Sequence, residues 1–478
     1  MKPFLLTIFP SPSLFCSDPL YTGNQWIYDL INILPVWQSN ITGQGIRVRV
    51  NDDGVDITHP EFEGRYDASA SCDNVSPTTY HGTAVASIVL AGKNNDECSV
   101  GIAPDAILSA CNVFDGRSLS FLGEQVEQYD ISQNSYGFPA CETTIGVDGE
   151  HRELQACPFT YNDPDNGSPC DVCDFGANPK SAECVSSISF HCRNYYELEI
   201  SACLQFLELY VPDGECDYPS LSQLAQDSLA TGILTGRDEK GTIYVFASGN
   251  SFSFGEDTNL KGLTNSRFII SVGAVGKDGI HSSYSTPGAS LFLVGPGGDK
   301  ENLSNMITAS SGGGCRDATI GTSFSAPVIS GVIALMLQAN TALTWRDVQG
   351  ILAQTSRFVA TDPSDTTRNT NAAGFTHSNL YGFGIVDANA AVNAAKIWEL
   401  FDKELMLVAE SGALNTPLTD NEETPVLSSA TITSDSANTF VAESVEIYIA
   451  LQHFSRGDLE IILTSPQGTE SIIHPGMS

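Results

Sequence analysis

Apolar residues along the first 400 positions follow two spacings in turn. Short β-rich runs predict strands at residues 46–51, 106–112, 131–136, 242–247 and 268–272. Longer segments with apolar residues at helical spacing predict helices at residues 81–92, 221–235, 328–339 and 344–356, and a short helix after 387. The run TIYVFA is apolar throughout, which is typical of a strand buried on both faces of a parallel sheet. The pattern therefore favours an α/β domain.

This pattern is interrupted once and later replaced. Between about residues 139 and 219, cysteines, prolines and Asp-Asn-Gly clusters take the place of periodic apolar residues. We interpret this segment as a disulfide-stapled insertion, in which a more apolar stretch near 188–210 is expected to carry a helix. Beyond about residue 401, Ser, Thr and Asn become more frequent, and alternating runs predict strands at 444–451 and 458–464. This β-rich region stops in mid-pattern, so we expect the chain to be a fragment.

The composition narrows the functional classes. A net charge of −35 argues against nucleic-acid binding, because phosphates would be repelled. It is compatible with basic substrates or calcium, although a solvated acidic surface is its commoner meaning. No apolar run reaches the ~18 residues needed to span a bilayer. Residues 1–17 contain one lysine and a short apolar run that Pro3 and Pro10 interrupt, a pattern compatible with a degraded signal or leader.

Cysteine usage indicates an oxidising compartment. The chain has 13 cysteines, eight of them between Cys141 and Cys216, a density typical of disulfide-bonded proteins. Zinc binding is the alternative; it is disfavoured because the one CxxC, at residues 170–173, has no matching pair of histidines. Four N-x-[ST] sequons are permissive of secretion, although such sequons are frequent by chance: Asn40, Asn74, Asn166 and Asn302.

Separate motifs carry the candidate chemistry. Ser323, in GTSFSAP, lies in the first turn of an apolar helix, where free N–H groups and the helix dipole favour negative charge. Taken singly, it would be a helix cap, Asp52 a turn residue at a strand end, and His81 an ordinary residue at a helix start. The order Asp, His, Ser is nevertheless one that builds a Ser-His-Asp triad. Asn250 follows the strand at 242–247, so its amide would be a donor at the same sheet edge as Asp52.

Together these motifs resemble those of the subtilisin superfamily and, within it, the kexin/furin-like branch. The triad motifs stand here as DDG at 52–54, HGT at 81–83 and GTSFSAP at 321–327. Matches at the level of the branch are IYVFASGN at 243–250, LTWRDVQ at 343–349, YGFG at 381–384 and RGDLEI at 456–461. The last is similar to the strand core of the branch's P domain. The resemblance covers residues 18–138 and 221 to the end, and the cysteine-rich insertion lies outside it.

The resemblance implies the fold and the domain organisation. It implies a subtilisin-like three-layer α/β peptidase domain over residues 18–400, with a mostly parallel sheet, helices on both faces and the insertion at 139–219. An incomplete all-β P domain, a jelly-roll-like sandwich, would follow at 401–478. Relatives cleave off an N-terminal prodomain, which we expect to be missing from this chain because it starts almost at the mature domain. A membrane anchor would be expected only in a missing C-terminal part.

The resemblance also implies residue roles. Ser323 would attack the scissile carbonyl, His81 would transfer its proton, Asp52 would orient the imidazole and Asn250 would donate to the oxyanion. Asp53 would lie where relatives read a basic substrate side chain. The full implied set of substrate-binding residues is Asp53, Ser135, Tyr136, Gly137, Ala247, Ser248 and Gly249.

A structural Ca²⁺ ion is the implied cofactor, because hard oxygen ligands suit it. The implied ligands, as side chains or carbonyls, are Asp18, Glu61, Gly92, Asn95, Glu97 and Ser99. Relatives usually have Asp where Glu61 stands, and a solvated polar loop is the alternative interpretation. Cys98 and Cys315 are similar to positions that are disulfide-bonded in relatives. The implied bond would tie the calcium loop to the segment before Ser323.

Two departures from the family pattern concern specificity. Kexin-like enzymes cut after Arg because acids line the primary pocket, whereas Ala140 and Lys261 stand at two of those places here. A lysine in that pocket would repel arginine, so the preference is not expected to be simply for Arg. A second calcium site that shares these acids is expected to be lost, unless nearby acids compensate: Glu142, Glu256 or Asp257.

We therefore expect a serine endopeptidase that acts on proteins or peptides in the secretory pathway, in a Golgi-like lumen, membrane-associated or secreted. Two alternatives stay open. One is a catalytically silent protein with a subtilase fold whose insertion blocks the cleft and binds a partner; the complete triad and Asn250 argue against it. The other is a secreted subtilase with a general digestive role.

Overall fold

The computed structural model describes residues 16–137, 221–358, 362–412, 414, 416–418, 425–432, 442–451 and 459–476. The predicted insertion, including its predicted helix near 188–210 and Ala140, lies outside the described residues. Residues 1–15 lie outside them as well.

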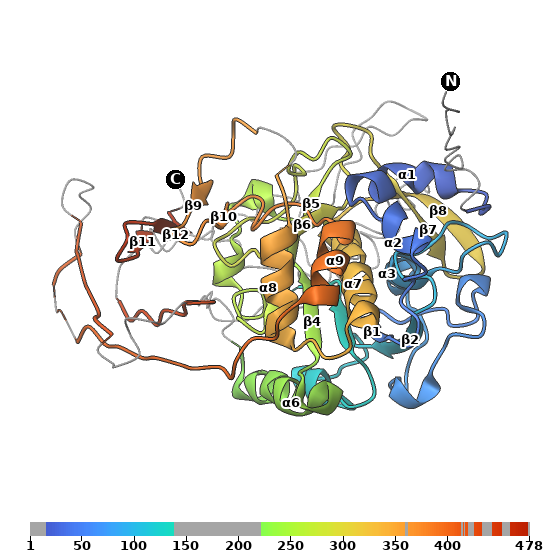
Figure 1. Cartoon of the computed structure of the whole chain (residues 1–478), viewed down its shortest axis with the longest axis horizontal. Helices are drawn as coiled ribbons and strands as arrows, with labels where there is room; N and C mark the ends of the chain where they lie inside the picture. Colours follow the sequence, from blue (N-terminus) through green and yellow to red (C-terminus); the bar gives the residue numbers. More distant parts are fainter. Residues whose placement is uncertain are drawn as a thin grey trace, which may run out of the picture. The chain divides into compact units, whose positions relative to one another are not determined.

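A six-stranded sheet organises the described residues between 16 and 400 (Figure 1). Its order is β2-β1-β3-β4-β5-β6, and all neighbouring pairs are parallel. The strands are β1 (Arg47–Asp52), β2 (Ile107–Asn112), β3 (Ile131–Asn134), β4 (Ile243–Ala247), β5 (Ile269–Val275) and β6 (Leu293–Pro296). The five strands predicted from the sequence are β1 to β5, and β6 was not predicted. Parallel order brings the carboxyl ends of β1, β3 and β4 to one edge of the sheet.

Alternation along β4 explains why helices cover both faces of the sheet. Val245 belongs to a core built with α7, whereas Tyr244 and Phe246 belong to a second core with α6. Both faces are therefore buried, as expected for a parallel sheet. The helices are α1 (Tyr21–Leu30), α2 (Leu34–Gln38), α3 (His81–Leu90), α6 (Gln223–Glu239), α7 (Thr322–Ala339), α8 (Trp345–Thr355) and α9 (Ala388–Ile397). The sequence pattern did not predict α1 and α2.

Helix α7 lies at the centre of the larger core, where it contacts α3, α9 and strands β3 to β6 (Figure 1). Its length and apolarity would suffice to cross a membrane, but 83% of the helix is buried inside the domain. It is therefore a core helix. The next helix, α8, begins with a capping box, in which the side chains of Thr344 and Asp347 each accept from the other's backbone N–H.

Short elements complete the described fold. An antiparallel hairpin of β7 (Met306–Ser310) and β8 (Gly314–Thr319) precedes α7, and β9 (Asn369–Thr370) pairs with β10 (Thr376–His377). Single 3₁₀ turns lie at Pro60–Phe62, Ala68–Ala70, Leu119–Gly123, Phe252–Phe254 and Thr258–Leu260.

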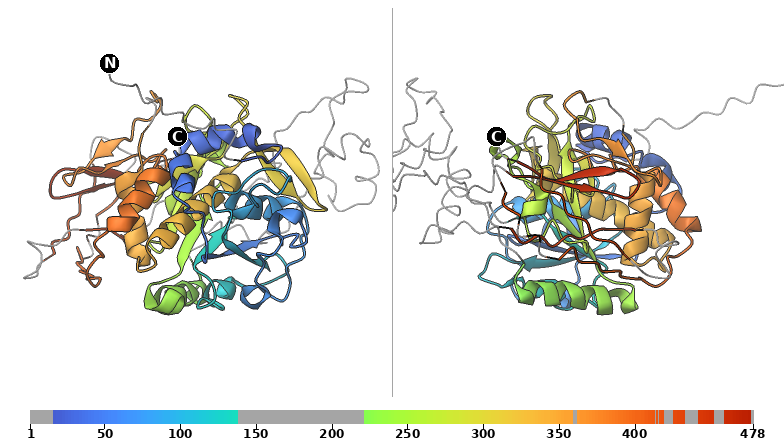
Figure 2. Two further views of the ribbon diagram at one scale, coloured as in Figure 1. Left: turned by 45° about the vertical axis from the view of Figure 1, so that its right-hand side comes forward. Right: turned by 90° about the vertical axis from the view of Figure 1, so that its left-hand side faces the viewer.

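The described C-terminal part contains the antiparallel pair β11 (Glu460–Thr464) and β12 (Glu470–Pro475), drawn in red in Figure 2. The first matches the strand predicted at 458–464. The strand predicted at 444–451 is wrong, because these residues form no strand although their polarity alternates. Val445 and Tyr448 are 64% and 95% exposed, so the apolar side chains lack the packing that would stabilise a strand there.

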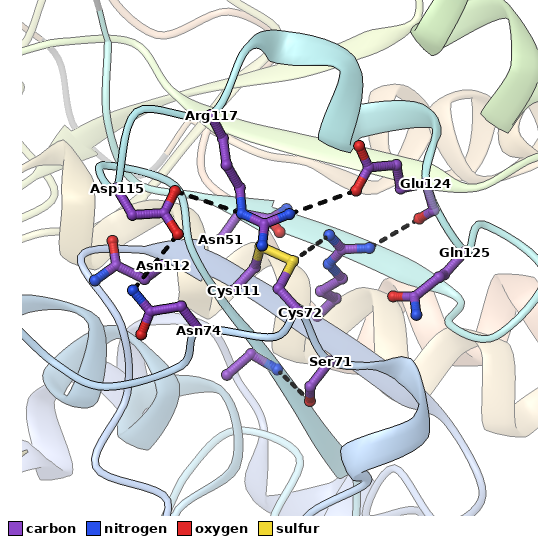
Figure 3. The surroundings of a disulfide bond; sticks show 12 residues. Asn51, Ser71, Cys72, Asn74, Cys111, Asn112, Asp115, Arg117, Glu124 and Gln125 are labelled. Carbon is purple, nitrogen blue, oxygen red and sulfur yellow. Dashed lines mark hydrogen bonds and ion pairs between the residues drawn. A yellow bond between two sulfur atoms is a disulfide. The ribbon is translucent and has the colours of Figure 1, made fainter.

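A disulfide that the sequence did not indicate joins Cys72 to Cys111 on β2 (Figure 3). Arg49 on β1 is fully buried against it, with Nη2 donating to Cys72 Sγ at 3.0 Å. Its Nη1 donates to the carbonyl of Glu124 at 2.8 Å, and its guanidinium lies 5.0 Å from the Tyr129 ring centroid. One arginine thus ties β1 to the disulfide and to the loop before β3.

Arg49→Ala is expected to lower the free energy of unfolding by about 3 kcal/mol, because it removes buried packing and leaves a carbonyl without its donor. Arg47→Ala is the matched control. Arg47 lies two residues away on the same strand, but its side chain is 47% exposed and its ion pair with Asp67 spans 3.6 Å. That change should cost less than about 1 kcal/mol. Chemical denaturation followed by circular dichroism measures both, and equal losses would contradict the assignment.

Candidate active site

Asp52 is the last residue of β1, and its side chain is 1% exposed. Its Oδ1 accepts two hydrogen bonds, from His81 Nδ1 at 2.7 Å and from the Asp53 N–H at 2.8 Å. The carboxylate is therefore held toward the first residue of α3. Gly82 makes this approach possible, because a Cβ on it would lie 2.0 Å from the Gly54 carbonyl oxygen and 3.0 Å from Asp52 Cβ. A larger residue at position 82 would push α3 away from β1.

The electrostatics of this pair favour a charged imidazole. Burial lowers the pKa of His81, but the adjacent Asp52 carboxylate outweighs burial and raises the pKa above its usual value. Burial raises the pKa of Asp52, and the neighbouring ring opposes that effect. The pair can thus take up a proton at the ring while the carboxylate compensates the charge.

Ser323 lies in the first turn of α7. The ring of the following residue, Phe324, has its centroid 5.3 Å from that of His81. The Ser323 hydroxyl donates to the carbonyl of Ser135 at 3.0 Å, and the Ser135 hydroxyl donates back to the Ser323 carbonyl at 2.5 Å. These reciprocal bonds fix the start of α7 against the end of β3. A contact between the hydroxyl and the His81 ring would need the hydroxyl to turn from Ser135.

Asn250 has a defined amide orientation. Its Oδ1 accepts from the backbone N–H and the hydroxyl of Thr322, each at 2.9 Å, so Nδ2 faces elsewhere. Nδ2 of Asn250 lies near Gly321, which has φ +145°. A Cβ placed on Gly321 would lie 3.6 Å from Asn250 Nδ2 and 3.7 Å from the Ser323 nitrogen. Two N–H donors therefore border the same small space, at the N-terminus of a long helix. Such an arrangement suits a developing oxyanion.

The sequence did not single out Thr322, which the structure places at the centre of these contacts. Besides holding Asn250, its hydroxyl accepts from the backbone N–H of Gly249 at 3.2 Å. It thereby joins α7 to the segment after β4. Its position within GTSFSAP was the available signal, and its role depends on a neighbour 72 residues away.

The other segments expected to bind substrate lie at the same edge. Ser135, Tyr136 and Gly137 follow β3, and residues 247–249 end and follow β4, with Asn134 and Phe246 as register partners. Asp53 is 6% exposed, and its oxygens accept from Thr79 and Gly82 backbone N–H groups, each at 2.8 Å. Its carboxylate holds the start of α3, and its contact with a substrate side chain stays a prediction.

The residues expected to bind calcium converge in one loop cluster. Asp18 accepts through its two oxygens from the N–H groups of Asn94 and Asn95, at 2.9 and 3.0 Å. Fully buried Glu61 accepts from Asn95 Nδ2 at 2.9 Å and from the Ser99 N–H at 3.2 Å. The Gly92 N–H donates to the Glu61 carbonyl, and the Glu97 N–H donates to Asn95 Oδ1.

The chemistry of this cluster fits a hard cation. Burial raises the pKa of Glu61 to about 7, and the Asp18 carboxylate adds to the shift against hydrogen bonds that lower it. A buried carboxylate whose ionisation is opposed by burial and by a second, neighbouring carboxylate is what a divalent ion would compensate. No three acidic, histidine or cysteine side chains of the described residues converge as ligands, so carbonyl and amide oxygens would complete the coordination.

The disulfide that the resemblance implied, Cys98–Cys315, is present. It joins the calcium-loop candidate to β8, a few residues before Ser323. The disulfide thus links this loop to the hairpin that precedes α7, across a sequence separation of 217 residues.

Two family profiles and several known proteins match this chain. The profile of the Subtilase family matches residues 43–137 and 214–384, and that of the Proprotein convertase P-domain matches residues 442–477. The chain is 30% identical over 467 residues to PC3-like endoprotease variant B from Hydra vulgaris, covering 92% of this chain and 54% of that protein. It is 30% identical over 459 residues to human proprotein convertase subtilisin/kexin type 5, covering 92% of this chain and 21% of that protein. The chain thus spans about half or less of these relatives.

Among solved structures, the serine protease of Aeromonas sobria superposes with a TM-score of 0.62 at 20% identity, over 100% of this chain and 85% of that one. At that identity the likeness concerns the fold alone. It supports the subtilisin-like α/β architecture expected from the sequence.

The His81 pair generates a prediction for the titration of the ring. In a Ser323→Ala background, the His81 imidazole should titrate above 6.5, because Asp52 stabilises its cation. Adding Asp52→Asn removes that charge and leaves burial, so the midpoint should fall. Proton-detected NMR of the histidine rings measures both midpoints. His281 is the internal control, since burial lowers its pKa to about 4 in either background. An unchanged His81 midpoint would rule out the assigned pairing.

Proposed function

Since this chain belongs to the subtilase family, we propose that it is a serine endopeptidase in which Ser323, His81 and Asp52 are the catalytic groups. The observation that carries the proposal is the 2.7 Å bond between His81 Nδ1 and Asp52 Oδ1 at the sheet edge, beside the first turn of α7. Because Nδ1 is engaged with the carboxylate, Nε2 is the ring nitrogen available to act as a base.

In the first proposed step, Ser323 Oγ bonds to the substrate carbonyl carbon while its proton passes to His81 Nε2. The carbonyl electron pair moves to oxygen, and Asn250 Nδ2 and the Ser323 N–H donate to that oxyanion. The carbonyl then reforms, the C–N bond breaks, and the departing amine takes the proton from His81. Water repeats the sequence with the acyl-enzyme and releases the acid. Asp52 stays ionised throughout and compensates the imidazolium.

We further propose the domain organisation and the biological setting. A peptidase domain over residues 18–400, with an insertion at 139–219, would be followed by part of a P domain at 401–478. The curated relatives include enzymes named proprotein convertases. By this likeness, the substrates would be proteins of the secretory pathway or the cell exterior, cut at bonds not simply defined by Arg. A digestive role would instead show as broad cleavage of a mixed peptide library.

Calcium is the proposed structural cofactor. Asp18, Glu61 and Asn95 would supply side-chain oxygens, and the carbonyls of Gly92, Glu97 and Ser99 would complete the set. When bound, the ion would neutralise the buried carboxylates and rigidify the loop that the Cys98–Cys315 disulfide ties to β8. Its part would be structural, since the catalytic groups come from other segments.

The catalytic proposal is tested with a fluorophosphonate probe, which reacts with activated serines. The folded protein should be labelled at Ser323, and Ser323→Ala should abolish the labelling. Ser69→Ala is the control; Ser69 is exposed and its hydroxyl donates to Asp67 Oδ1 at 2.6 Å, so labelling should persist. Asn250→Ala should lower kcat by about 10²–10³-fold, the loss known for the corresponding amide of a subtilisin. Folded protein that binds a partner but is never labelled would favour the silent alternative.

The calcium proposal is tested by thermal unfolding with and without a chelator. Free Ca²⁺ at 100 times its Kd should stabilise the protein by about 2.7 kcal/mol, and chelation should remove this effect. Glu61→Gln should remove most of the response to calcium. Glu63→Gln, at an exposed position two residues away, should leave it intact. Equal calcium responses of the two variants would exclude Glu61 as a ligand.

A further inference from the structure

The space beside Gly249 is bordered by two polar side chains. A Cβ on Gly249, which has φ +113°, would lie 2.8 Å from Lys261 Nζ and 2.9 Å from Thr286 Oγ1. Both groups come from segments outside the proposed catalytic set. Gly249 directly precedes Asn250, the proposed oxyanion donor. The substrate residue whose carbonyl Asn250 would bind carries its side chain on the adjacent Cα. The side chain of the residue before the cut must therefore lie close to this segment.

Lys261 is not an isolated cation. Its ammonium pairs with Glu256 Oε2, and the two side chains are only 13% and 9% exposed. An ammonium carries three N–H donors, and Glu256 is its one hydrogen-bond partner within the described part of the chain. Donors are thus available on a group whose charge is already compensated.

Thr286 adds a second donor at this place. It is fully buried, and its Oγ1 accepts from the Ser251 N–H at 3.1 Å, which leaves the hydroxyl proton for another acceptor. Asp257 also lies nearby, but its Oδ1 accepts from the Asn259 N–H at 2.8 Å and faces Gly288. The groups bordering Gly249 therefore present donors.

We infer that Lys261, paired with Glu256 and next to Thr286, makes this subsite select uncharged side chains that carry a hydrogen-bond acceptor, Gln and Asn first, at the residue before the cut. Substrate Arg and Lys side chains are disfavoured because the Lys261 ammonium repels their positive charge, and Glu256 already pairs with Lys261. Substrate Glu and Asp side chains would be stabilised less by this ion pair than by an unpaired lysine. The pair has no net charge, so it offers little compensation for the hydration that these carboxylates lose. This inference rests on the proposed endopeptidase function.

The test compares kcat/KM for fluorogenic peptides that differ only in Gln, Asn, Glu or Arg before the cut. The concentration of active enzyme is set by fluorophosphonate titration. Wild type should prefer Gln over Arg by at least about tenfold. Lys261→Glu should raise kcat/KM for Arg by at least about tenfold, with the labelled fraction unchanged. Lys396→Glu is the matched control, because it makes the same charge change at an exposed position of α9 and should leave the preference as in wild type.

A second variant keeps the inference testable where Lys261→Glu fails to fold. Lys261→Met with Glu256→Gln replaces the ion pair by uncharged side chains of similar length, and it should reduce the discrimination against Arg without creating a preference for it. Labelled wild type that prefers Arg or Glu, or labelled variants with an unchanged preference, would overturn this inference and leave the endopeptidase proposal standing. Folded wild type without any labelling would instead overturn the endopeptidase proposal.

Discussion

The proposed catalytic arrangement depends on hydroxyl bonds that hold α7 against the strands. Ser325 Oγ donates to the Gly273 carbonyl of β5 at 2.6 Å and accepts from the Gly295 N–H of β6 at 3.1 Å. Ser330 Oγ bonds Gln133 on β3. The absence of a Cβ on Gly295 allows this contact, since a Cβ there would lie 3.0 Å from Ser325 Oγ. Apolar burial alone would let the helix slide or rotate, whereas these directional bonds fix the depth at which Ser323 meets the sheet edge.

Much of this fold could be predicted from the sequence because its signals are local. Strands β1 to β5 are short runs with β-rich composition, and α8 begins at a capping box within four residues. Contacts between distant segments left little local trace. The buried Arg49 appears in the sequence as one of two alternating arginines of a strand, and only the tertiary structure distinguishes it from exposed Arg47. The Cys72–Cys111 bond was equally hidden, since any pairing of cysteines is compatible with their positions.

The two adjacent carboxylates at the end of β1 show what the direction of a side chain adds to motif reasoning. Asp52 and Asp53 have the same chemistry, and the resemblance assigned a role to each. The structure turns them to different partners: Asp52 Oδ1 to the His81 ring, and Asp53 to backbone N–H groups of the turn before α3 and of its first residues. Side chains of successive residues in an extended chain point to opposite sides. The Asp52 side chain therefore reaches the His81 ring, whereas the Asp53 side chain accepts hydrogen bonds from the start of α3. The order of residues names the candidates, and the direction of each side chain decides its function.

The charges of this protein would have opposite effects on a basic substrate at long range and at contact distance. The net charge of −35 makes a field that attracts basic peptides from solution, which would raise the rate of encounter. In the proposed subsite, Lys261 acts within contact distance of the residue before the cut. Encounter and selection are separate steps, because long-range attraction changes the association rate while discrimination depends on contacts made in the transition state. An acidic surface therefore does not imply cleavage after a basic residue, and a compensated lysine beside the oxyanion donor can reverse the preference that overall composition suggests.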